Sequence, residues 1–132
     1  MGATAITPTA SPDLVAHRKA VSEPFPEVIQ GLTSIIGRKL TAYIASITDA
    51  RALDRWSHNS TPHGDVESRL RHAYRVVSML AEHDSPAVVQ AWLLGLNPEL
   101  QDEVPLQLLR EGKLESDGKR VLAAARAFVA GG

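Results

Sequence analysis

The chain has 132 residues, of which 44% are hydrophobic and 22% charged, and its formal net charge is -1. These values are typical of one globular domain and argue against a strongly basic nucleic-acid-binding protein. Cysteine is absent, which excludes disulfides, thiolate metal sites and cysteine nucleophiles. No apolar run approaches the roughly 20 residues that span a bilayer, and the first residues do not resemble a secretory signal. We therefore expect a cytoplasmic protein without a membrane partner.

The N-terminal segment, residues 1–25, contains Pro8, Pro12 and Pro24 among threonine, serine and alanine. Its few apolar residues follow no sustained period. The composition is typical of a flexible arm, and a short helical turn is expected only around residues 14–20.

Helical periodicity begins at Pro26, a residue that suits the first turn of a helix. Apolar residues then recur at helical spacing until Gly37 breaks the run. A second helix is predicted at residues 39–46, and Asp49 is expected to cap a third helix that ends at Trp56. A helix, a short turn and a second helix of this size predict a helix-turn-helix-like N-terminal half.

The remaining helices follow a loop of turn-forming residues after Trp56. Residues 66–82 carry the clearest apolar stripe in the chain, and shorter helices are predicted at 86–94, 105–110 and 119–130. No segment alternates like a β-strand, so the predicted fold class is all-α. The expected organisation is an arm at residues 1–25, a helix-turn-helix-like region at 26–82 and a small C-terminal helical module at 83–132.

The predicted turn and third helix carry residue types that bind nucleic acid. Residues 36–82 hold seven basic and five acidic side chains, whereas residues 83–132 hold five basic and seven acidic ones, so DNA contact is expected in the first half. Two arginines on an exposed helix can bind phosphates or can merely be solvated, and the residues alone leave these interpretations even. The candidate DNA-binding residues are Thr48, Arg51, Arg55, Ser57, Asn59 and Arg69.

The sequence gives less support for a metal site or a catalytic site than for DNA binding. The spacings of His58, His63, His72 and His83 match no zinc pattern, so we interpret them as surface histidines and expect no metal or cofactor. The carboxylate pairs of the C-terminal half lack a neighbour that would raise a carboxyl pKa or supply a nucleophile. No catalytic residue is predicted, and the chain is not expected to be an enzyme.

Four apolar residues surround the Asn-Pro turn that follows the fifth predicted helix. They are Trp92, Leu96, Pro98 and Leu100. Considered without any relative, they predict a turn held by side chains that pack on the preceding helix, and burial is the default for them. They are not predicted to bind a partner.

A succession of residues resembles a known family over roughly residues 36–130. The specific part is Asn-Pro, then Pro-x-x-Leu-Leu-x-x-Gly, then Val-Leu. Through this succession of motifs the chain resembles the Xre/MbcA/ParS-type antitoxins. The residues that carry the resemblance are Arg55-Trp56, the helix 66–82, Trp92-Leu93, Leu96-Asn97-Pro98-Glu99-Leu100, Pro105, Leu108-Leu109, Gly112 and Val121-Leu122.

The resemblance implies that the first half dimerises or binds operator DNA and that the second half neutralises a toxin. That toxin has the RES fold and consumes NAD. In the family the C-terminal helix and tail lie over the toxin's substrate cleft, which implies toxin-binding roles for Arg126, Phe128, Val129 and Gly132. The expected partners are a RES-domain toxin, a second copy of the chain and operator DNA, with no small-molecule substrate.

Other interpretations of the same residues stay open. Leu122, Ala125 and Val129 equally complete the protein's own core, and opposite faces of one helix can serve both purposes. The chain could also be a stand-alone helix-turn-helix transcriptional regulator, or a protein interaction module that does not bind DNA. A neighbouring gene for a RES-type protein would favour the antitoxin.

Overall fold

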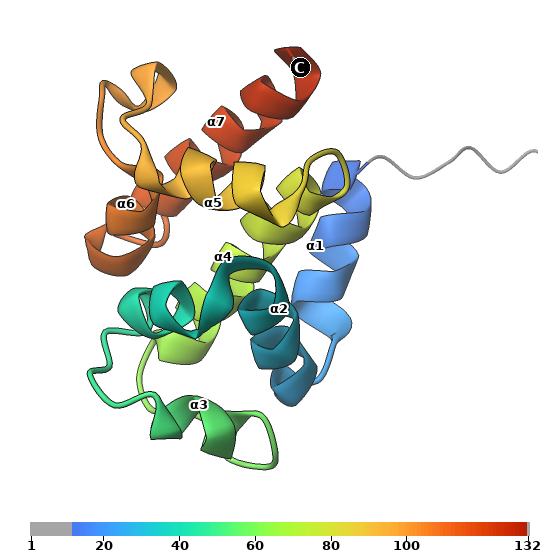
Figure 1. Cartoon of the computed structure of the whole chain (residues 1–132), viewed down its shortest axis with the longest axis vertical. Helices are drawn as coiled ribbons and strands as arrows, with labels where there is room; N and C mark the ends of the chain where they lie inside the picture. Colours follow the sequence, from blue (N-terminus) through green and yellow to red (C-terminus); the bar gives the residue numbers. More distant parts are fainter. Residues whose placement is uncertain (1–11, 132) are drawn as a thin grey trace, which may run out of the picture.

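The computed structural model describes residues 12–131, which form seven α-helices and a 3-10 turn and contain no β-strand (Figure 1). The predicted all-α class is confirmed. The elements are α1 Pro12–Ser22, α2 Phe25–Ile44, α3 Arg51–Trp56, α4 Val66–Ala81, α5 Pro86–Leu94, η2 Pro98–Leu100, α6 Pro105–Glu111 and α7 Asp117–Gly131. Gly132 and the first part of the predicted arm lie outside the described residues.

The helix α4 lies at the centre of the molecule and packs against α1, α2, α5, α6 and α7. Its last turns are buried almost all round, because each residue from 76 to 80 is buried. The buried apolar residues form one continuous core that extends from Ala16 in α1 to Ala125 in α7. The two predicted halves of the chain therefore share a core around α4.

The helix α2 bends at Gly37, as the sequence predicts. The backbone there has φ 87° and ψ 167°, a conformation that is open essentially only to glycine. The second segment of α2 then runs to Ile44, and the chain turns through Ser46, whose φ is 59°. The bend directs this second segment across α6, with which α2 packs.

The helix α3 is six residues long and is attached through its buried face. Leu53 is fully buried, and the ring of Trp56 lies 6.3 Å from that of Phe25 between centroids. Asp49 acts at its start, since its Oδ1 accepts a hydrogen bond from the backbone nitrogen of Arg51 at 2.9 Å. Helical segments do precede and follow the turn at residues 45–50, but the helix-turn-helix arrangement and its use in DNA binding stay predictions.

The helix α1 covers residues 14–20, where the sequence predicts a short helical turn within a flexible arm, and it is longer than that turn, since it spans residues 12–22. Its apolar attachment to α4 consists of Ala16 and Ala20, two side chains too small to give a strong apolar period. Polar contacts supply the rest of the attachment between α1 and α4. Arg71 of α4 donates from Nη1 to the carbonyls of Ala20 and Glu23, which satisfies the end of α1.

Candidate functional site

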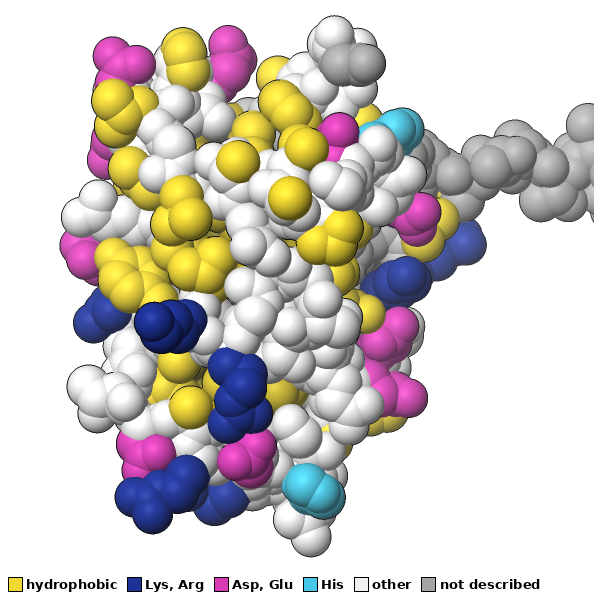
Figure 2. Space-filling model, in the orientation of Figure 1, with side chains coloured by type: hydrophobic (Ala, Val, Ile, Leu, Met, Phe, Trp, Pro, Cys, Tyr) yellow, Lys and Arg dark blue, Asp and Glu magenta, His cyan; other side chains and the backbone are white. Residues whose placement is uncertain are grey.

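The helix α5 is apolar on all sides, since Gln90 is the one polar residue among its nine. Only Val89 and Leu93 are buried. A helix that is apolar all round is ordinarily covered on every face, yet Val88 is 39% exposed and Leu94 53%. Figure 2 shows hydrophobic side chains over this part of the surface. Such a contiguous exposed apolar area is typical of a binding site.

A hollow of about 390 Å³ lies between the end of α5, η2 and α7. We call it the α5–α7 hollow. Trp92, Leu96 and Pro98 line one side of it, and Ala124, Ala127 and Phe128 of α7 line the other. The rings of Trp92 and Phe128 lie 6.3 Å apart between centroids, at an interplanar angle of 52°. Two tilted aromatic rings thus form the floor of an apolar depression.

The segment from Asn97 to Glu103 closes on itself and fixes this geometry. The Asn97 side chain accepts a hydrogen bond from the backbone nitrogen of Glu99 at 2.9 Å, and the Asn97 backbone nitrogen donates to the Glu103 carbonyl at 3.1 Å. Leu100 points inward and is 1% exposed. The closed loop therefore anchors itself through Leu100 and leaves its flanking apolar residues outside.

The prediction that these four apolar residues are buried is confirmed for Leu100, is met in part by Trp92, which packs against the core, and is wrong for Leu96 and Pro98. Leu96 is 73% exposed, Pro98 is exposed, and Trp92 is partly buried. The physical reason is that backbone hydrogen bonds close the loop, so it needs no packing of Leu96 on α5. These residues are the part of the site that sequence reasoning missed.

The predicted toxin-binding residues of α7 have different surroundings. Phe128 is 39% exposed in the α5–α7 hollow, and Val129 packs against the core, as do the buried Leu122 and Ala125. Arg126 points the other way, because its Nε donates to the carboxylate of Asp13 in α1 at 2.8 Å. Gly132 lies outside the described residues. Phe128 is therefore the predicted residue that the structure places in the hollow.

The ion pair of Arg126 belongs to a small charged cluster between α1, α4 and α7. Arg75 of α4 also donates to the carboxylate of Asp13, at 3.3 Å. Burial raises the pKa of Asp13, but the hydrogen bonds and charges of Arg126 and Arg75 outweigh it, so that the net pKa is lowered. These ion pairs hold α1 against α4 and α7, the helices that carry the two arginines.

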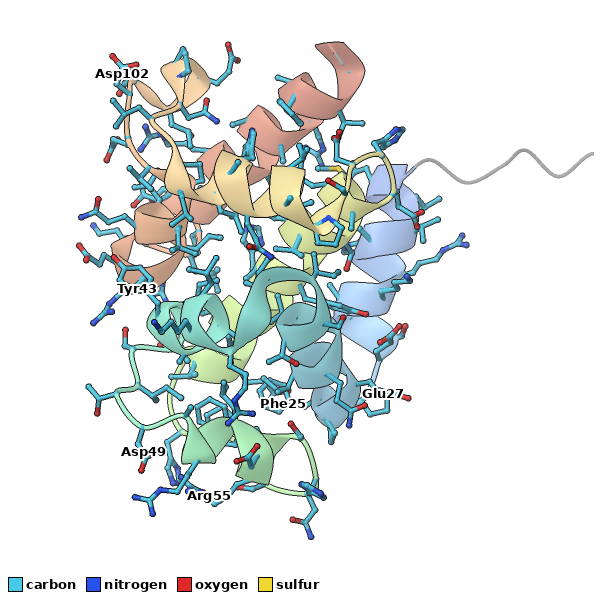
Figure 3. The ribbon with its side chains drawn as sticks, in the orientation of Figure 1. Phe25, Glu27, Tyr43, Asp49, Arg55 and Asp102 are labelled. Carbon is cyan, nitrogen blue, oxygen red and sulfur yellow. The ribbon has the colours of Figure 1, made fainter. Side chains whose placement is uncertain are left out.

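The predicted DNA-binding residues around α3 are mostly exposed, namely Thr48, Arg51, Arg55 and Asn59. Figure 3 shows Asp49 and Arg55 together at the α3 end of the molecule. Ser57 is partly buried, and its hydroxyl donates to the carbonyl of Leu53 at 2.7 Å. Acidic side chains accompany the arginines, since Arg51 pairs with Asp49 at 2.7 Å. The pKa of Asp49 is lowered by these hydrogen bonds from Arg51.

Arg69 stands apart from these residues. Its side chain is 14% exposed and donates from Nη1 to the carbonyls of Leu109 and Gly112, at 2.8 and 2.9 Å. Its Nη2 pairs with Asp65 at 3.1 Å. Because helix-terminal carbonyls lack partners within their helix, Arg69 completes the end of α6. The structure does not add Arg69 to the exposed arginines of α3.

The four histidines that the sequence analysis considers as metal ligands do not cluster in the structure. His58, His63 and His83 are exposed, as predicted, but His72 is partly buried between α4 and α7, where its Nε2 donates to the carbonyl of Gly118 at 2.7 Å. Across residues 12–131, no three histidine or carboxylate side chains lie close enough together to hold a metal ion. The prediction of surface histidines is therefore wrong for His72, which ties the start of α7 to the central helix.

In the same described range, every helix is too short or too polar to cross a lipid bilayer. Comparisons of the chain with models of known protein families, with curated proteins and with solved structures find no match.

Proposed function

We propose that the chain is a non-enzymatic antitoxin that binds and neutralises a RES-type, NAD-consuming toxin in the cytoplasm. The observation that carries the proposal is the exposed apolar surface of the α5–α7 hollow, made by Trp92, Leu96 and Phe128. Several residues that resemble the Xre/MbcA/ParS-type antitoxins, the Trp92-Leu93 and Asn97-Pro98 pairs among them, lie in or beside this surface. The resemblance and the exposed apolar area thus coincide.

The chemistry of the hollow fits a protein segment better than a small metabolite. Binding sites for metabolites combine apolar walls with a few convergent polar groups that fix orientation. Here the Asn97 side chain is already engaged by the backbone of Glu99, and Glu99 is the one charged residue among the described residues that line the hollow. The other lining residues are glycine, alanine, leucine, proline and the two aromatic residues, so no set of polar groups converges on the hollow. Exposed aromatic anchors beside apolar side chains are typical of protein interfaces.

Within this proposal Phe128 is the anchor, and Arg126 has a secondary role. An exposed ion pair contributes about 0–1 kcal/mol, so the contact between Arg126 and Asp13 could be exchanged for a contact with a partner. The ring of Phe128 can contact a partner without breaking an ion pair, because it already lines the hollow.

Operator binding through the α3 end is the second part of the proposal. Exposed Arg51 and Arg55 beside Thr48 support it. A six-residue helix offers little reach into a major groove, and Asp49 and Asp54 neutralise part of the basic charge. A stand-alone transcriptional regulator is therefore the weaker alternative, and a regulatory role is proposed only beside toxin binding.

Co-expression with a RES-type protein encoded next to this chain tests the main proposal. The parent chain should rescue growth and co-purify with the toxin, whereas Leu96→Asp with Phe128→Ala should abolish both while the purified variant melts like the parent. Val88→Asp is the matched control, because Val88 is an exposed apolar residue of α5 that does not line the hollow. Full rescue by the double variant would overturn the assignment of the hollow.

A mobility-shift assay with the chain's own upstream DNA tests the second part. Replacing Arg51 and Arg55 with alanine should weaken binding and flatten its salt dependence, because phosphate contacts release counterions. The control is Arg69→Lys, which keeps a charge at a position that faces the end of α6. Absence of any shift with the parent chain would remove DNA binding while leaving toxin binding intact.

A further inference from the structure

A second hollow lies between α1, α4 and the loop that leads into α7. We call it the α1–α4 hollow, after the two helices that form its walls and lie side by side (Figure 1). Its volume is about 370 Å³. Small-molecule sites ordinarily have volumes of roughly 300–1,000 Å³, so the hollow can hold a small ligand. It shares no described lining residue with the α5–α7 hollow.

The polar lining of the α1–α4 hollow is basic, apart from the hydroxyl of Ser68. Arg71, His72 and Arg75 come from α4 and His17 from α1, and none of the described lining residues is acidic. The side chains of Arg71 and Arg75 are 24% and 22% exposed, so both are largely withdrawn from water. A hollow lined by charges of one sign attracts the opposite charge, which favours an anionic occupant.

Arg75 has hydrogen-bond donors to spare. Its Nη2 donates to Asp13 at 3.3 Å, but the same carboxylate accepts a shorter hydrogen bond, of 2.8 Å, from Arg126. Among the described residues, the Nε of Arg75 is the one buried side-chain nitrogen or oxygen without a hydrogen-bond partner. Buried donors in native proteins ordinarily have an acceptor, so this nitrogen calls for one. The side chain that carries it lines the hollow.

Arg71 contributes a second, fixed positive charge. Its Nε pairs with Glu67 at 2.9 Å, and its Nη1 donates to carbonyls at the end of α1. Glu67 thus offsets the charge of Arg71, whereas Asp13 is shared by two arginines. One positive charge is left for an occupant. A carboxylate matches it, because its single charge is spread over two oxygens that can accept two hydrogen bonds from one guanidinium.

The remaining walls of the hollow are apolar. Ala20 and Val21 of α1 lie on one side, and Leu114 lies in the loop before α7. Val21 is 64% exposed, which leaves most of its side chain in contact with water. An inorganic anion would leave these walls uncovered. A ligand that also carries an aliphatic chain or an aromatic ring would remove them from water and gain affinity from that burial.

We propose that the α1–α4 hollow binds a small carboxylate with an apolar body. The guanidinium of Arg75 turns from Asp13 to the ligand, so that Nε and one Nη donate to its two oxygens, while Asp13 keeps its hydrogen bond from Arg126. The apolar body covers Val21 and Leu114. Bound in this way, the ligand joins α1 to the central helix and stabilises the fold. The site does not rest on the proposed toxin or DNA.

Isothermal titration calorimetry of the full chain tests the ligand class with three probes, namely hexanoate, octanoate and phenylacetate. At least one should bind saturably at a single site and raise the melting temperature. Acetate lacks the apolar body, octan-1-ol lacks the charge and inorganic phosphate lacks both features of the match, so each should bind about tenfold more weakly or worse. Failure of all three probes to saturate, or equal binding of octan-1-ol or phosphate, would overturn the proposal.

Variants test the residues with the probe that binds best. Arg75→Gln should weaken binding about tenfold or more. Arg126→Gln is the matched control, because it removes the other arginine from Asp13 but does not line the hollow, and it should bind like the parent. Val21→Asp places a negative charge in an exposed wall, so it should abolish binding without changing the melting temperature of the free protein. Val88→Asp, at an exposed apolar position of α5, is its control.

Binding to Arg75→Gln or to Val21→Asp with the affinity of the parent would place the ligand elsewhere and overturn the assignment. The outcome is separate from that of the toxin experiment, because Val21→Asp leaves the α5–α7 hollow intact and should still rescue growth wherever the parent does.

Discussion

Gln90 donates a hydrogen bond from its Nε2 to the main-chain carbonyl of Ile35, at 2.9 Å. Ile35 lies two residues before Gly37, where the backbone of α2 leaves the helical conformation. The last carbonyls of a helical segment have no donor within that segment, so the bend creates a need for an outside donor. Gln90, the one polar residue of α5, meets this need and attaches α5, which lines the α5–α7 hollow, to the bend.

Gln90→Ala should lower the free energy of unfolding by about 1–2 kcal/mol, because a partly buried carbonyl loses its donor. Urea unfolding followed by circular dichroism measures the change. Lys119→Ala, an exposed substitution on α7, is the control and should stay within about 0.5 kcal/mol of the parent. A Gln90→Ala variant as stable as the control would show that water serves the Ile35 carbonyl equally well.

Gly37→Ala should destabilise the protein more than Gly64→Ala. Neither added methyl group meets any atom within 4 Å, so the difference reports the backbone alone. Gly37 has φ 87° and ψ 167°, in a region that a Cβ atom makes costly by about 1–3 kcal/mol. Gly64 also has a positive φ, 68°, but it lies in the loop before α4, whereas Gly37 lies inside α2, whose packing on α6 depends on the bend.

Thermal unfolding of the two glycine variants, measured side by side, checks this order. Equal melting temperatures would indicate that the bend in α2 relaxes when Gly37 is replaced, and that the position of α6 against α2 does not depend on it.

The sequence was sufficient to predict the helices whose signals are local. Ser85 followed by Pro86 predicts the start of α5, and the Ser85 side chain does accept a hydrogen bond from the backbone nitrogen of Val88. Gly37 predicts the bend for the same kind of reason. The helix α1 was predicted only as a short turn, because the contacts that hold its full length, with Arg71, Arg75 and Arg126, join residues more than 45 positions apart.

The candidate site was predictable in composition but not in exposure. The sequence shows that α5 and the residues after it are apolar, which equally fits a buried turn. Exposure of Leu96 depends on how residues 97–103 close, and that closure depends on backbone hydrogen bonds that leave no apolar period. Likewise, the sequence around Arg69 does not distinguish it from an exposed arginine. Its hydrogen bond to the Leu109 carbonyl depends on the position of α6, which lies 40 residues further along the chain.

Leu93 and Leu94 are neighbours on α5 with opposite environments, so their truncations should differ sharply. Leu93 is fully buried, and Leu93→Ala should cost about 2–5 kcal/mol of unfolding free energy through lost burial and a residual cavity. Leu94 is half exposed, and Leu94→Ala should cost less than about 1 kcal/mol. Urea unfolding followed by circular dichroism measures both losses. Similar losses for the two would mean that α5 is rotated from the orientation described.

Protonation of His72 should make the stability of the protein depend on pH below neutrality. Burial lowers the pKa of His72 from its usual 6.5, an effect that the hydrogen bond to the Gly118 carbonyl opposes and the charge of Arg75 reinforces. The folded protein therefore holds the neutral ring, whereas the unfolded chain takes up a proton near pH 6.5. The stability contributed by the neutral ring is complete above that pH and is lost as the pH falls below it.

The variant His72→Gln keeps an N–H donor for the Gly118 carbonyl but does not titrate. Urea unfolding at about pH 7.5 and about pH 5 should show a larger loss of stability for the parent than for His72→Gln. The other four histidines, His17, His58, His63 and His83, are exposed and present in both proteins, so their contribution cancels in the comparison. An equal loss in the two proteins would mean that the buried ring accepts its proton in the folded state as readily as in the unfolded one, and that the contact between α4 and α7 tolerates the charge.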